Sequence, residues 1–313
     1  MKRRSIIAVG LAVVLSLGAC AGDEDAATEP ETEETTESEE PGTEMPTVKL
    51  DGENTVLVFP DSNAPEGLQI EVVEEGEGRI VEETDFVIAH YVGQVWGNEV
   101  PFDSSFSRGA PTGFSLQQVI PGWTQGLSGL SAGSKVILSI PADLGYGPSG
   151  GMPSAGIGEE DTIAFYVEII DAYGLEQAAD PNASGEVDPA TLPVVYEGAI
   201  GEPILSISVQ EDLTEPSVIT TTVIARGTGE ELALDGSTAY VQYAMSFWDN
   251  SATEITYGIS GPFPAEMGLG SLFDVLEGIP VGSRVLIVVP GSDDGQSATA
   301  PPFAVVVDIL GVH

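Results

Sequence analysis

The hydrophobic pattern of the chain after residue 46 predicts strands that are separated by Gly and Pro. The runs TVLVF, DFVIAHYVG, KVILSIP and TIAFYVEIIDAY are rich in β-branched and aromatic residues, and several alternate apolar with polar positions. That alternation is typical of strands that bury one face. One segment has the period of a helix instead, because a helix can begin at Pro121 and Trp123, Leu127 and Leu130 then share a face. The pattern predicts an α+β protein that is mostly β.

The same order of runs occurs twice along the chain. The segment GLSGLSAGSKVILSIP has a counterpart in VLEGIPVGSRVLIVVP, and DTIAFYVEII has one in APPFAVVVDIL. Self-similarity of this kind indicates a duplicated structural unit. The loose polar stretch AADPNASGEVDPATLP lies between the two copies. The sequence therefore predicts two tandem domains, residues 47–174 and 196–313, joined by a linker at residues 175–195.

The first twenty residues, MKRRSIIAVGLAVVLSLGAC, have the pattern of an export signal. A basic start precedes an apolar run from Ile6 to Leu17, which is shorter than the ~20 residues that span a membrane. The run leads to Cys20, the one cysteine of the chain. This arrangement resembles a bacterial lipoprotein signal peptide at residues 1–20, and the alternative is an ordinary signal peptide with an incidental cysteine. A lipidated Cys20 leaves no thiol for a disulfide. The signal-like pattern predicts an exported protein that is lipid-anchored to the outer face of the cytoplasmic membrane and contacts the membrane through that anchor alone.

Acidic residues dominate the charge. The chain has 50 Asp and Glu against 9 Lys and Arg, which gives a formal net charge of −41. Because proteins bind phosphate backbones through basic patches, this charge argues against a nucleic-acid partner. Many of the acids lie in residues 21–46, where few large apolar side chains occur. Such a segment cannot bury enough surface to offset its ordering entropy, so it is predicted to be an acidic disordered tether.

The loop VPFDSSFSRGAP places one of the few basic residues near an acid. Arg108 follows Asp103 by five residues, and the aromatic Phe102 precedes that acid. A carboxylate among aromatic rings is costly unless a cation or hydrogen-bond donor compensates it. The loop is therefore either exposed surface with a weak ion pair or the wall of a pocket.

Five segments of the first copy occur in the order and near the spacing of one enzyme family. They are AHYVG, PFDSSFSRG, QVIPGWTQGLSGLSAGSKVILSIP, LGYG and IAFYVEIID. On these segments, residues 59–173 resemble an FKBP-type peptidyl-prolyl cis-trans isomerase. The resemblance implies a twisted antiparallel sheet wrapped around a short helix, with an apolar pocket between them. The repeat extends this fold to a second FKBP-like domain.

The resemblance also implies the residues of the pocket. It assigns catalytic positions to Tyr91, Phe102, Asp103, Trp123, Tyr146 and Phe165, and substrate contacts to Arg108, Val119, Ile120 and Ile157. It makes Trp123 the floor, and it makes Asp103 a buried acid whose partners are Arg108 and the Tyr91 phenol. It implies no cofactor and no metal. The residues agree, because the chain has only two histidines, His90 and His313, and no His-rich cluster, which leaves a hydrolase triad and a zinc site unsupported.

The implied activity is isomerisation of X-Pro bonds in exported proteins. Resonance in the imide gives a rotation barrier of ~18–20 kcal/mol. The twisted transition state loses that resonance and is less polar at oxygen, so a dry aromatic pocket favours it over the planar ground state. The N–H of Ile120 is expected to bind the substrate carbonyl, and no proton transfer is required. The partners are proline-containing unfolded or exported polypeptides, with macrolide inhibitors as further ligands. The alternative is a proline-peptide binding module or holdase chaperone without significant turnover.

The first copy departs from the family pattern in two places that bear on substrate selection. Thr112 stands where many members have an aromatic wall, so a shallower pocket is expected on that side. Ile157-Gly158-Glu159 stands where the family usually has Ile-Pro-Pro, and this exchange is expected to loosen the loop.

The second copy is expected to have lost the pocket and with it the activity. Tyr243 aligns with Tyr91, but Glu254-Ile255 stand at the place of Phe102-Asp103, and Leu272 or Phe273 falls at that of Trp123. Peptide binding, support of the first domain and dimerisation are open roles for it.

Overall fold

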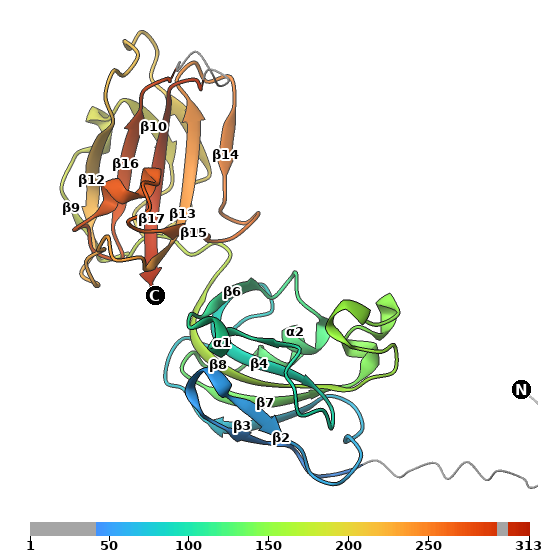
Figure 1. Cartoon of the computed structure of the whole chain (residues 1–313). Coiled ribbons are helices and arrows are strands. Elements are labelled where there is room, and N and C mark those ends of the chain that lie inside the picture. Colours follow the sequence, from blue (N-terminus) through green and yellow to red (C-terminus); the bar gives the residue numbers. More distant parts are fainter. Residues whose placement is uncertain (1–41, 293–299) are drawn as a thin grey trace, which may run out of the picture. The chain divides into compact units, whose positions relative to one another are not determined.

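The computed structural model of the chain describes residues 42–292 and 300–313. The predicted signal peptide, Cys20 and residues 21–41 of the predicted tether lie outside the described residues. The rest is mostly β, as predicted, and contains two large antiparallel sheets and two small hairpins (Figure 1). Within the described residues, no helix has the length and apolar character needed to span a membrane.

The last residues of the predicted tether, which ends at residue 46, pack against the folded chain. The Gly42 N–H donates to the carbonyl of Ala64 (3.2 Å), and Pro46 is buried. Met45 packs against the apolar cluster around Leu57. Met45 and Pro46 are apolar and can therefore pack, although acids dominate the composition of the segment as a whole.

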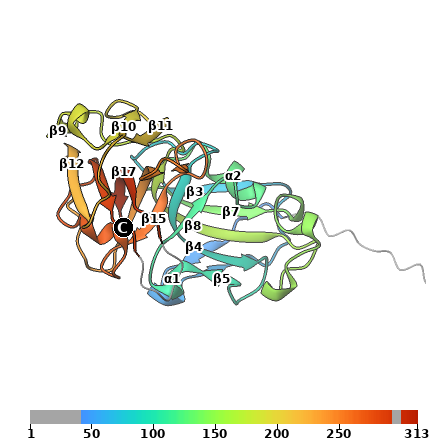
Figure 2. The same ribbon diagram turned by 90° about the horizontal axis from the view of Figure 1, so that it is seen from above.

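The first large sheet runs in the order β3-β7-β8-β4-β5, and β6 pairs with the remaining part of β4 (Figure 2). Its strands are β3 (Gln69–Glu74), β4 (Phe86–Val95), β5 (Asp103–Ser104), β6 (Thr112–Ser115), β7 (Lys135–Ile140) and β8 (Ile163–Tyr173). Its helical elements are α1 (Ser105–Arg108), α2 (Pro121–Leu127), η2 (Ala142–Leu144), η3 (Gly147–Ser149) and η4 (Pro153–Ala155). Successive residues of a strand point to opposite faces of the sheet, so Tyr91 and Val92 on β4 belong to separate apolar clusters.

Helix α2 packs on the face of the sheet that carries the larger cluster. It begins at Pro121 as predicted, and its Trp123 and Leu127 are buried, while Leu130 lies beyond its end. Two glycines let it lie close to β7. An added Cβ at Gly122 would lie 2.3 Å from a methyl carbon of Ile140, well inside van der Waals contact. This close approach fixes the height of Trp123 above the sheet.

A hairpin that precedes β3 covers the opposite face of the sheet. It consists of β1 (Thr47–Lys49), η1 (Gly52–Asn54) and β2 (Val56–Val58). The fully buried side-chain amide of Gln94 on β4 binds Leu57 on both sides, accepting from its N–H and donating to its carbonyl (3.2 Å). The hairpin is therefore fastened to the sheet by buried hydrogen bonds as well as by apolar contact.

The second large sheet runs in the order β9-β12-β16-β17-β13-β14, with β15 paired to β13. Its strands are β9 (Ser184–Gly185), β12 (Thr220–Arg226), β13 (Thr238–Phe247), β14 (Thr253–Ile255), β15 (Phe263–Glu266), β16 (Arg284–Val289) and β17 (Phe303–Val312). The remaining elements are η5 (Pro189–Thr191), η6 (Leu272–Leu276) and the hairpin of β10 (Val194–Glu197) and β11 (Ser206–Val209). Apart from β9, the order repeats that of the first sheet strand for strand.

The predicted linker at residues 175–195 is wrong in extent. It contains β9, which pairs with β12, together with η5 and the first residues of β10. Leu192 and Val194 are buried in the apolar cluster of the second sheet. Spaced apolar residues within a polar stretch were sufficient to order it.

A buried ion pair lies within the second sheet. Arg284 and Asp308 are both inaccessible to solvent and are joined by two hydrogen bonds of 2.7 Å. The guanidinium also donates to the carbonyls of Gly198, Ala199 and Glu202. The pair therefore holds the loop between β10 and β11 against the sheet.

Candidate functional site

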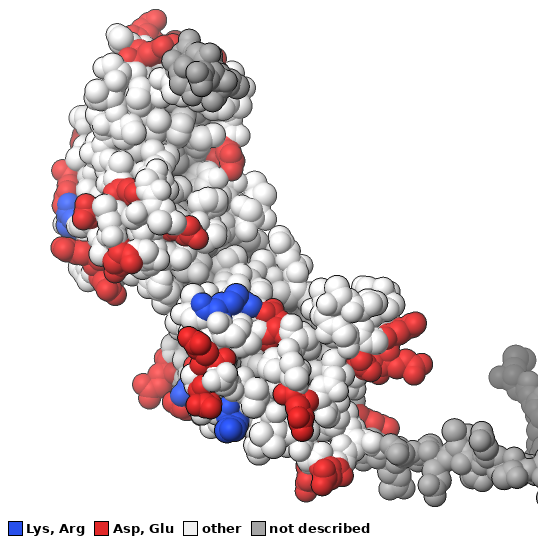
Figure 3. Space-filling model, in the orientation of Figure 1, with Lys and Arg blue, Asp and Glu red and all other residues white. Residues whose placement is uncertain are grey.

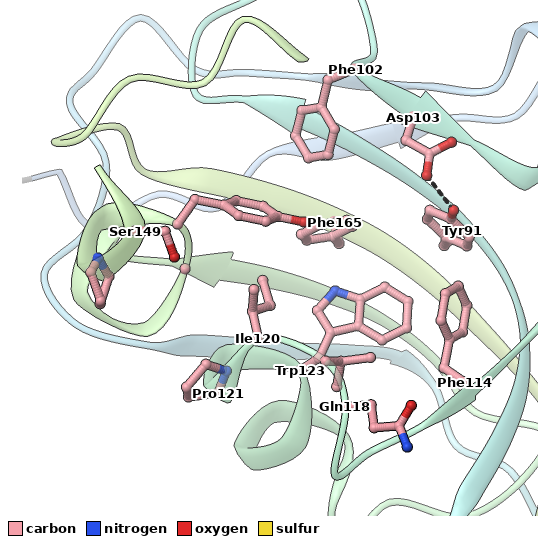
Figure 4. Close-up of a pocket in the computed structure, with 14 residues that line it drawn as sticks. Tyr91, Phe102, Asp103, Phe114, Gln118, Ile120, Pro121, Trp123, Ser149 and Phe165 are labelled. Carbon is pink, nitrogen blue, oxygen red and sulfur yellow. Dashed lines mark hydrogen bonds between the residues drawn. The ribbon is translucent and has the colours of Figure 1, made fainter. Parts of the chain in front are cut away.

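A cavity of about 570 Å³ lies between α2 and the first sheet. Its lining residues come from β4, β5 and the residue before it, β6, the segment before α2, α2, β8 and the loop after β7, and all of them are drawn in Figure 4. They are Tyr91, Phe102, Asp103, Phe114, Gln118, Val119, Ile120, Pro121, Trp123, Gly145, Tyr146, Pro148, Ser149 and Phe165.

The indole of Trp123 forms the floor of this cavity. It is 3% exposed, and its ring meets those of Tyr91 (centroids 5.5 Å apart, 87°) and Phe165 (5.2 Å, 89°) edge to face. Phe114 packs against it from the side at 5.1 Å. Aromatic pairs prefer this perpendicular arrangement, so the four rings hold one another in place.

A glycine on β4 allows the upper rings to meet. Gly93 pairs with Asp103 of β5 and with Phe165 of β8. A Cβ at this position would lie 2.6 Å from both the Phe102 and the Phe165 ring. Those two rings meet edge to face at 5.5 Å. Because Gly93 has no side chain, the rings of Phe102 and Phe165 have room to form the wall of the cavity.

The acid of the loop belongs to a hydrogen-bond network at the mouth of the cavity. The phenol of Tyr91 and the guanidinium of Arg108 both donate to the carboxylate of Asp103. Arg108 also donates to the Tyr91 oxygen (2.8 Å) and to Thr112 Oγ1 (3.3 Å). Of the two readings that the sequence left open, the pocket wall is correct. The expectation of a buried acid is wrong, because the Asp103 side chain is 42% exposed. It lies at the rim, where water reaches it.

The protonation states of the rim follow from these contacts. Burial, together with the hydrogen bond to Asp103, raises the pKa of the Tyr91 phenol to about 12. Burial acts to raise the pKa of the Asp103 carboxyl, but the hydrogen bonds from Tyr91 and Arg108 outweigh it and hold that pKa below its usual range. At neutral pH the phenol is neutral and the carboxylate ionised, so neither group is poised to exchange a proton with a substrate.

Eight of the ten residues predicted for the pocket line the cavity. They are Tyr91, Phe102, Asp103, Val119, Ile120, Trp123, Tyr146 and Phe165. Arg108 acts on the rim through its hydrogen bonds. The N–H of Ile120 has no hydrogen-bond partner among residues 42–292 and 300–313, which leaves it available as a donor.

Ile157 was predicted to contact substrate, and the structure contradicts this. Its side chain is 1% exposed and packs in the core below the cavity. Pro148 and Ser149 line that side instead. The loop is also more firmly held than its glycines suggested, because Met152 and Ile157 exchange two backbone hydrogen bonds (2.8 and 3.2 Å). The N–H of Gly158 further donates to the carboxylate of Asp161 (2.7 Å).

Two positions that shape the pocket, Phe114 and Gly93, were not predicted from the sequence. Phe114 supplies the aromatic wall that Thr112 was expected to leave open. It lies two positions along the same strand and therefore on the same face as Thr112, and that spacing was the available signal. Gly93 is the last residue of the AHYVG segment, and nothing in the sequence shows that two rings need the space beside it.

The second sheet keeps one hydrogen bond of the rim. Tyr243 Oη donates to Glu254 (2.6 Å), as Tyr91 does to Asp103. In the strand register, Met245 pairs with Glu254 as Gly93 pairs with Asp103. The predicted alignment was therefore shifted by one residue, because Glu254 rather than Ile255 occupies the place of the rim acid.

The aromatic walls supplied by Phe102 and Phe165 are absent from the corresponding part of the second sheet. By the same register, Thr253 replaces Phe102, and Val305 replaces Phe165. Met245 adds a side chain where Gly93 has none. Counted back from the shared Gly-Ser turn before β7 and β16, Leu272 falls at the place of Trp123, which decides between the two predicted positions.

Comparison with known proteins identifies the first unit. The model of the family described as "FKBP-type peptidyl-prolyl cis-trans isomerase" matches residues 77–170. The isomerase FkpA of Escherichia coli strain K12 is 41% identical over 122 residues, which cover 38% of this chain and 43% of FkpA. The outer membrane protein MIP of Legionella longbeachae is 40% identical over 107 residues, 34% of this chain and 44% of MIP.

A shorter relative is matched almost end to end. The FK506-binding protein of Streptomyces anulatus is 36% identical over 114 residues, which cover 36% of this chain and 91% of that protein. The chain spans less than half the length of FkpA and MIP. Because it covers nearly all of a relative at 36% identity and has the aromatic cavity, the chain belongs to the FKBP-type peptidyl-prolyl cis-trans isomerase family.

Proposed function

We propose that the first unit catalyses cis–trans isomerisation of X-Pro bonds in polypeptides. The observation that carries this proposal is the aromatic cavity floored by Trp123 and walled by Phe102 and Phe165. It is lined mainly by apolar side chains, which suits a proline ring, and the N–H of Ile120 beside it has no partner among the described residues. FkpA and a second relative, a 22 kDa Escherichia coli protein, are named as isomerases of this type, which supports the assignment.

The chemistry follows from the character of the walls. Proline fits against the indole, and the Ile120 N–H binds the carbonyl that precedes it. Rotation about the imide moves charge off its oxygen, and apolar rings solvate the resulting form better than they solvate the planar amide. A millionfold acceleration requires about 8 kcal/mol of such differential binding. The rim network of Tyr91, Asp103 and Arg108 holds the rings in position and donates no proton.

A protease-coupled isomerisation assay with Phe102→Ala tests the proposal. Phe102 lies at the mouth and is only half-buried, so its truncation removes a wall and leaves the core intact. We expect kcat/KM to fall at least tenfold. Phe59→Ala is the matched control, because Phe59 is equally half-buried but packs on the opposite face against Trp96. Unchanged turnover in Phe102→Ala refutes this pocket as the source, and peptide binding without any rate enhancement selects the holdase alternative.

We propose that residues 196–313 form an FKBP-like domain without isomerase activity. The repeated strand order supports the fold, and so do β-bulges at matching places, between Ile88 and Ala89 and between Tyr240 and Val241. The side chain of Met245 argues against a working pocket. If Phe102→Ala and Trp123→Ala combined leave substantial activity, the second domain is active.

We propose that the protein is exported and held at the outer face of the cytoplasmic membrane by a lipid on Cys20. The signal-like residues 1–20 motivate this, and a relative named as an outer membrane protein is compatible with export. Cys20→Ser should move the protein from the membrane to the soluble fraction. Proline-containing exported polypeptides are the proposed partners, and the name of the Streptomyces relative makes FK506 a proposed inhibitor. On the face in Figure 3, Lys and Arg are few and scattered, which does not favour a nucleic-acid partner.

A further inference from the structure

A second cavity adjoins the aromatic pocket. It has a volume of about 390 Å³ and shares Phe102 and Asp103 with that pocket as a common wall. Its other residues come from the turn of the N-terminal hairpin and from the loop around β5. They are Glu53, Asn54, Thr55, Val56, Pro101, Ser104 and Ser107. We call it the hairpin subsite. The hairpin turn lies outside residues 77–170, so this wall is not part of the matched family domain.

The hairpin turn is a fixed wall. Thr55 is 2% exposed, and its hydroxyl donates to the carbonyl of Gly52 (2.8 Å) across the turn. Two residues further on, Leu57 is buried and bound on both backbone groups by Gln94. After the hairpin, the Trp96 indole N–H donates to the carbonyl of Ser62 (3.0 Å). The subsite therefore has a defined shape before any ligand arrives.

The subsite differs from the aromatic pocket in its chemistry. Most of its lining is polar, and the side chains of Glu53 and Asn54 make no hydrogen bond or ion pair with the described part of the chain. The charge of Asp103 is compensated by Arg108, but Arg108 does not line the subsite. The carboxylate of Glu53 therefore lies at the edge of a concave polar site and has no ion-pair partner among the described residues. A basic side chain complements it.

We propose that the hairpin subsite binds a Lys or Arg side chain of the polypeptide whose X-Pro bond occupies the aromatic pocket, with Glu53 as its ion-pair partner. The inference rests on the proposed isomerase function. Because Phe102 and Asp103 line both cavities, the basic residue lies close to the proline along the polypeptide. Glu53 thereby becomes a determinant of substrate specificity.

The test compares peptides that differ in one side chain. Lys is placed at each of the three positions before and after the X-Pro bond, and norleucine at the same positions gives the uncharged reference. We expect the full-length protein to favour Lys at one position. Glu53→Gln should lower kcat/KM for that peptide about two- to fivefold, the upper part of the range of an exposed ion pair, and leave the norleucine peptide unchanged. Glu53→Lys should reverse the preference.

Glu71→Gln is the matched control. Glu71 is exposed on β3, makes no hydrogen bond or ion pair within the described residues, and does not line either cavity. An equal loss in Glu71→Gln overturns the subsite, because it shows that only the net charge of −41 attracts basic peptides. Equal rates for Lys and norleucine at every position also overturn it.

Peptide titration separates this inference from the proposed function. If no peptide is isomerised but Glu53→Gln weakens binding of the Lys peptide alone, the function fails and the subsite stands. If peptides are isomerised without a Lys preference in rate or binding, the function stands and the subsite fails.

Discussion

Gly93→Ala should damage the pocket by adding a single methyl group. The new Cβ would lie 2.6 Å from the rings of Phe102 and Phe165, whereas apolar carbons are normally about 3.5–4.0 Å apart. One or both rings must therefore move by about 1 Å. Overpacking of this kind costs about 1–3 kcal/mol of folding free energy. A displacement of about 1 Å at a positioning group lowers rates by up to about a hundredfold, so we expect kcat/KM to fall ten- to hundredfold.

The protease-coupled assay measures the rate, and urea unfolding followed by tryptophan fluorescence measures the stability. Gly185→Ala is the control, because a Cβ there meets nothing within 4 Å. Loss of chain entropy in the unfolded state should leave that variant neutral or stabilised by up to about 1 kcal/mol. If Gly93→Ala kept the wild-type kcat/KM, the positions of the Phe102 and Phe165 rings would not determine the rate, which would refute this prediction.

Three further predictions concern the charged groups. Asp103→Asn should lower kcat/KM a few-fold in the same assay, with less than about 1 kcal/mol lost in urea unfolding, because the pair with Arg108 is half-exposed; unaltered kinetics would contradict a positioning role. The stability from the lowered pKa of Asp103 is present above the usual carboxyl value of about 3.9 and is lost as pH falls below it. That from the raised pKa of Tyr91 is present below about 10 and is lost as pH rises toward about 12. These two groups therefore predict a level kcat/KM between about pH 5 and 9, and a transition of kcat/KM inside that range would contradict the assignment. Arg284→Met should cost the second domain about 3–5 kcal/mol in calorimetry by leaving Asp308 buried and unpaired, without changing isomerase activity; an unshifted melting transition would refute it.

The strands and the helix α2 could be predicted because their residues carry a period. Alternation marks a half-buried strand regardless of its partners, and a Pro followed by spaced apolar residues marks a helix start. The pocket residues were predictable for a different reason. Each lies in a short segment whose aromatic residue has a fixed place in the family, so order and spacing sufficed for Tyr91, Trp123 and Tyr146.

Predictions failed where the type of a residue does not determine its position in the fold. An isoleucine that lines a pocket and one that fills a core look the same in sequence, so Ile157 was misplaced. The exposure of Asp103 depends on where the loop closes, which no local pattern encodes. The register of Glu254 depends on how β13 turns into β14, and no aromatic residue marks it there. Gly93 acts through the space it leaves, which only the neighbouring rings reveal.

The apolar pocket is proposed to accelerate rotation of the imide without proton transfer. The most direct measurement is kcat/KM of the purified protein for one X-Pro peptide in H₂O and in D₂O at neutral pH, with the uncatalysed rate taken in both solvents. The pocket described here predicts the same acceleration in the two solvents. A clearly slower catalysed rate in D₂O would place a proton in the rate-limiting step and contradict the account.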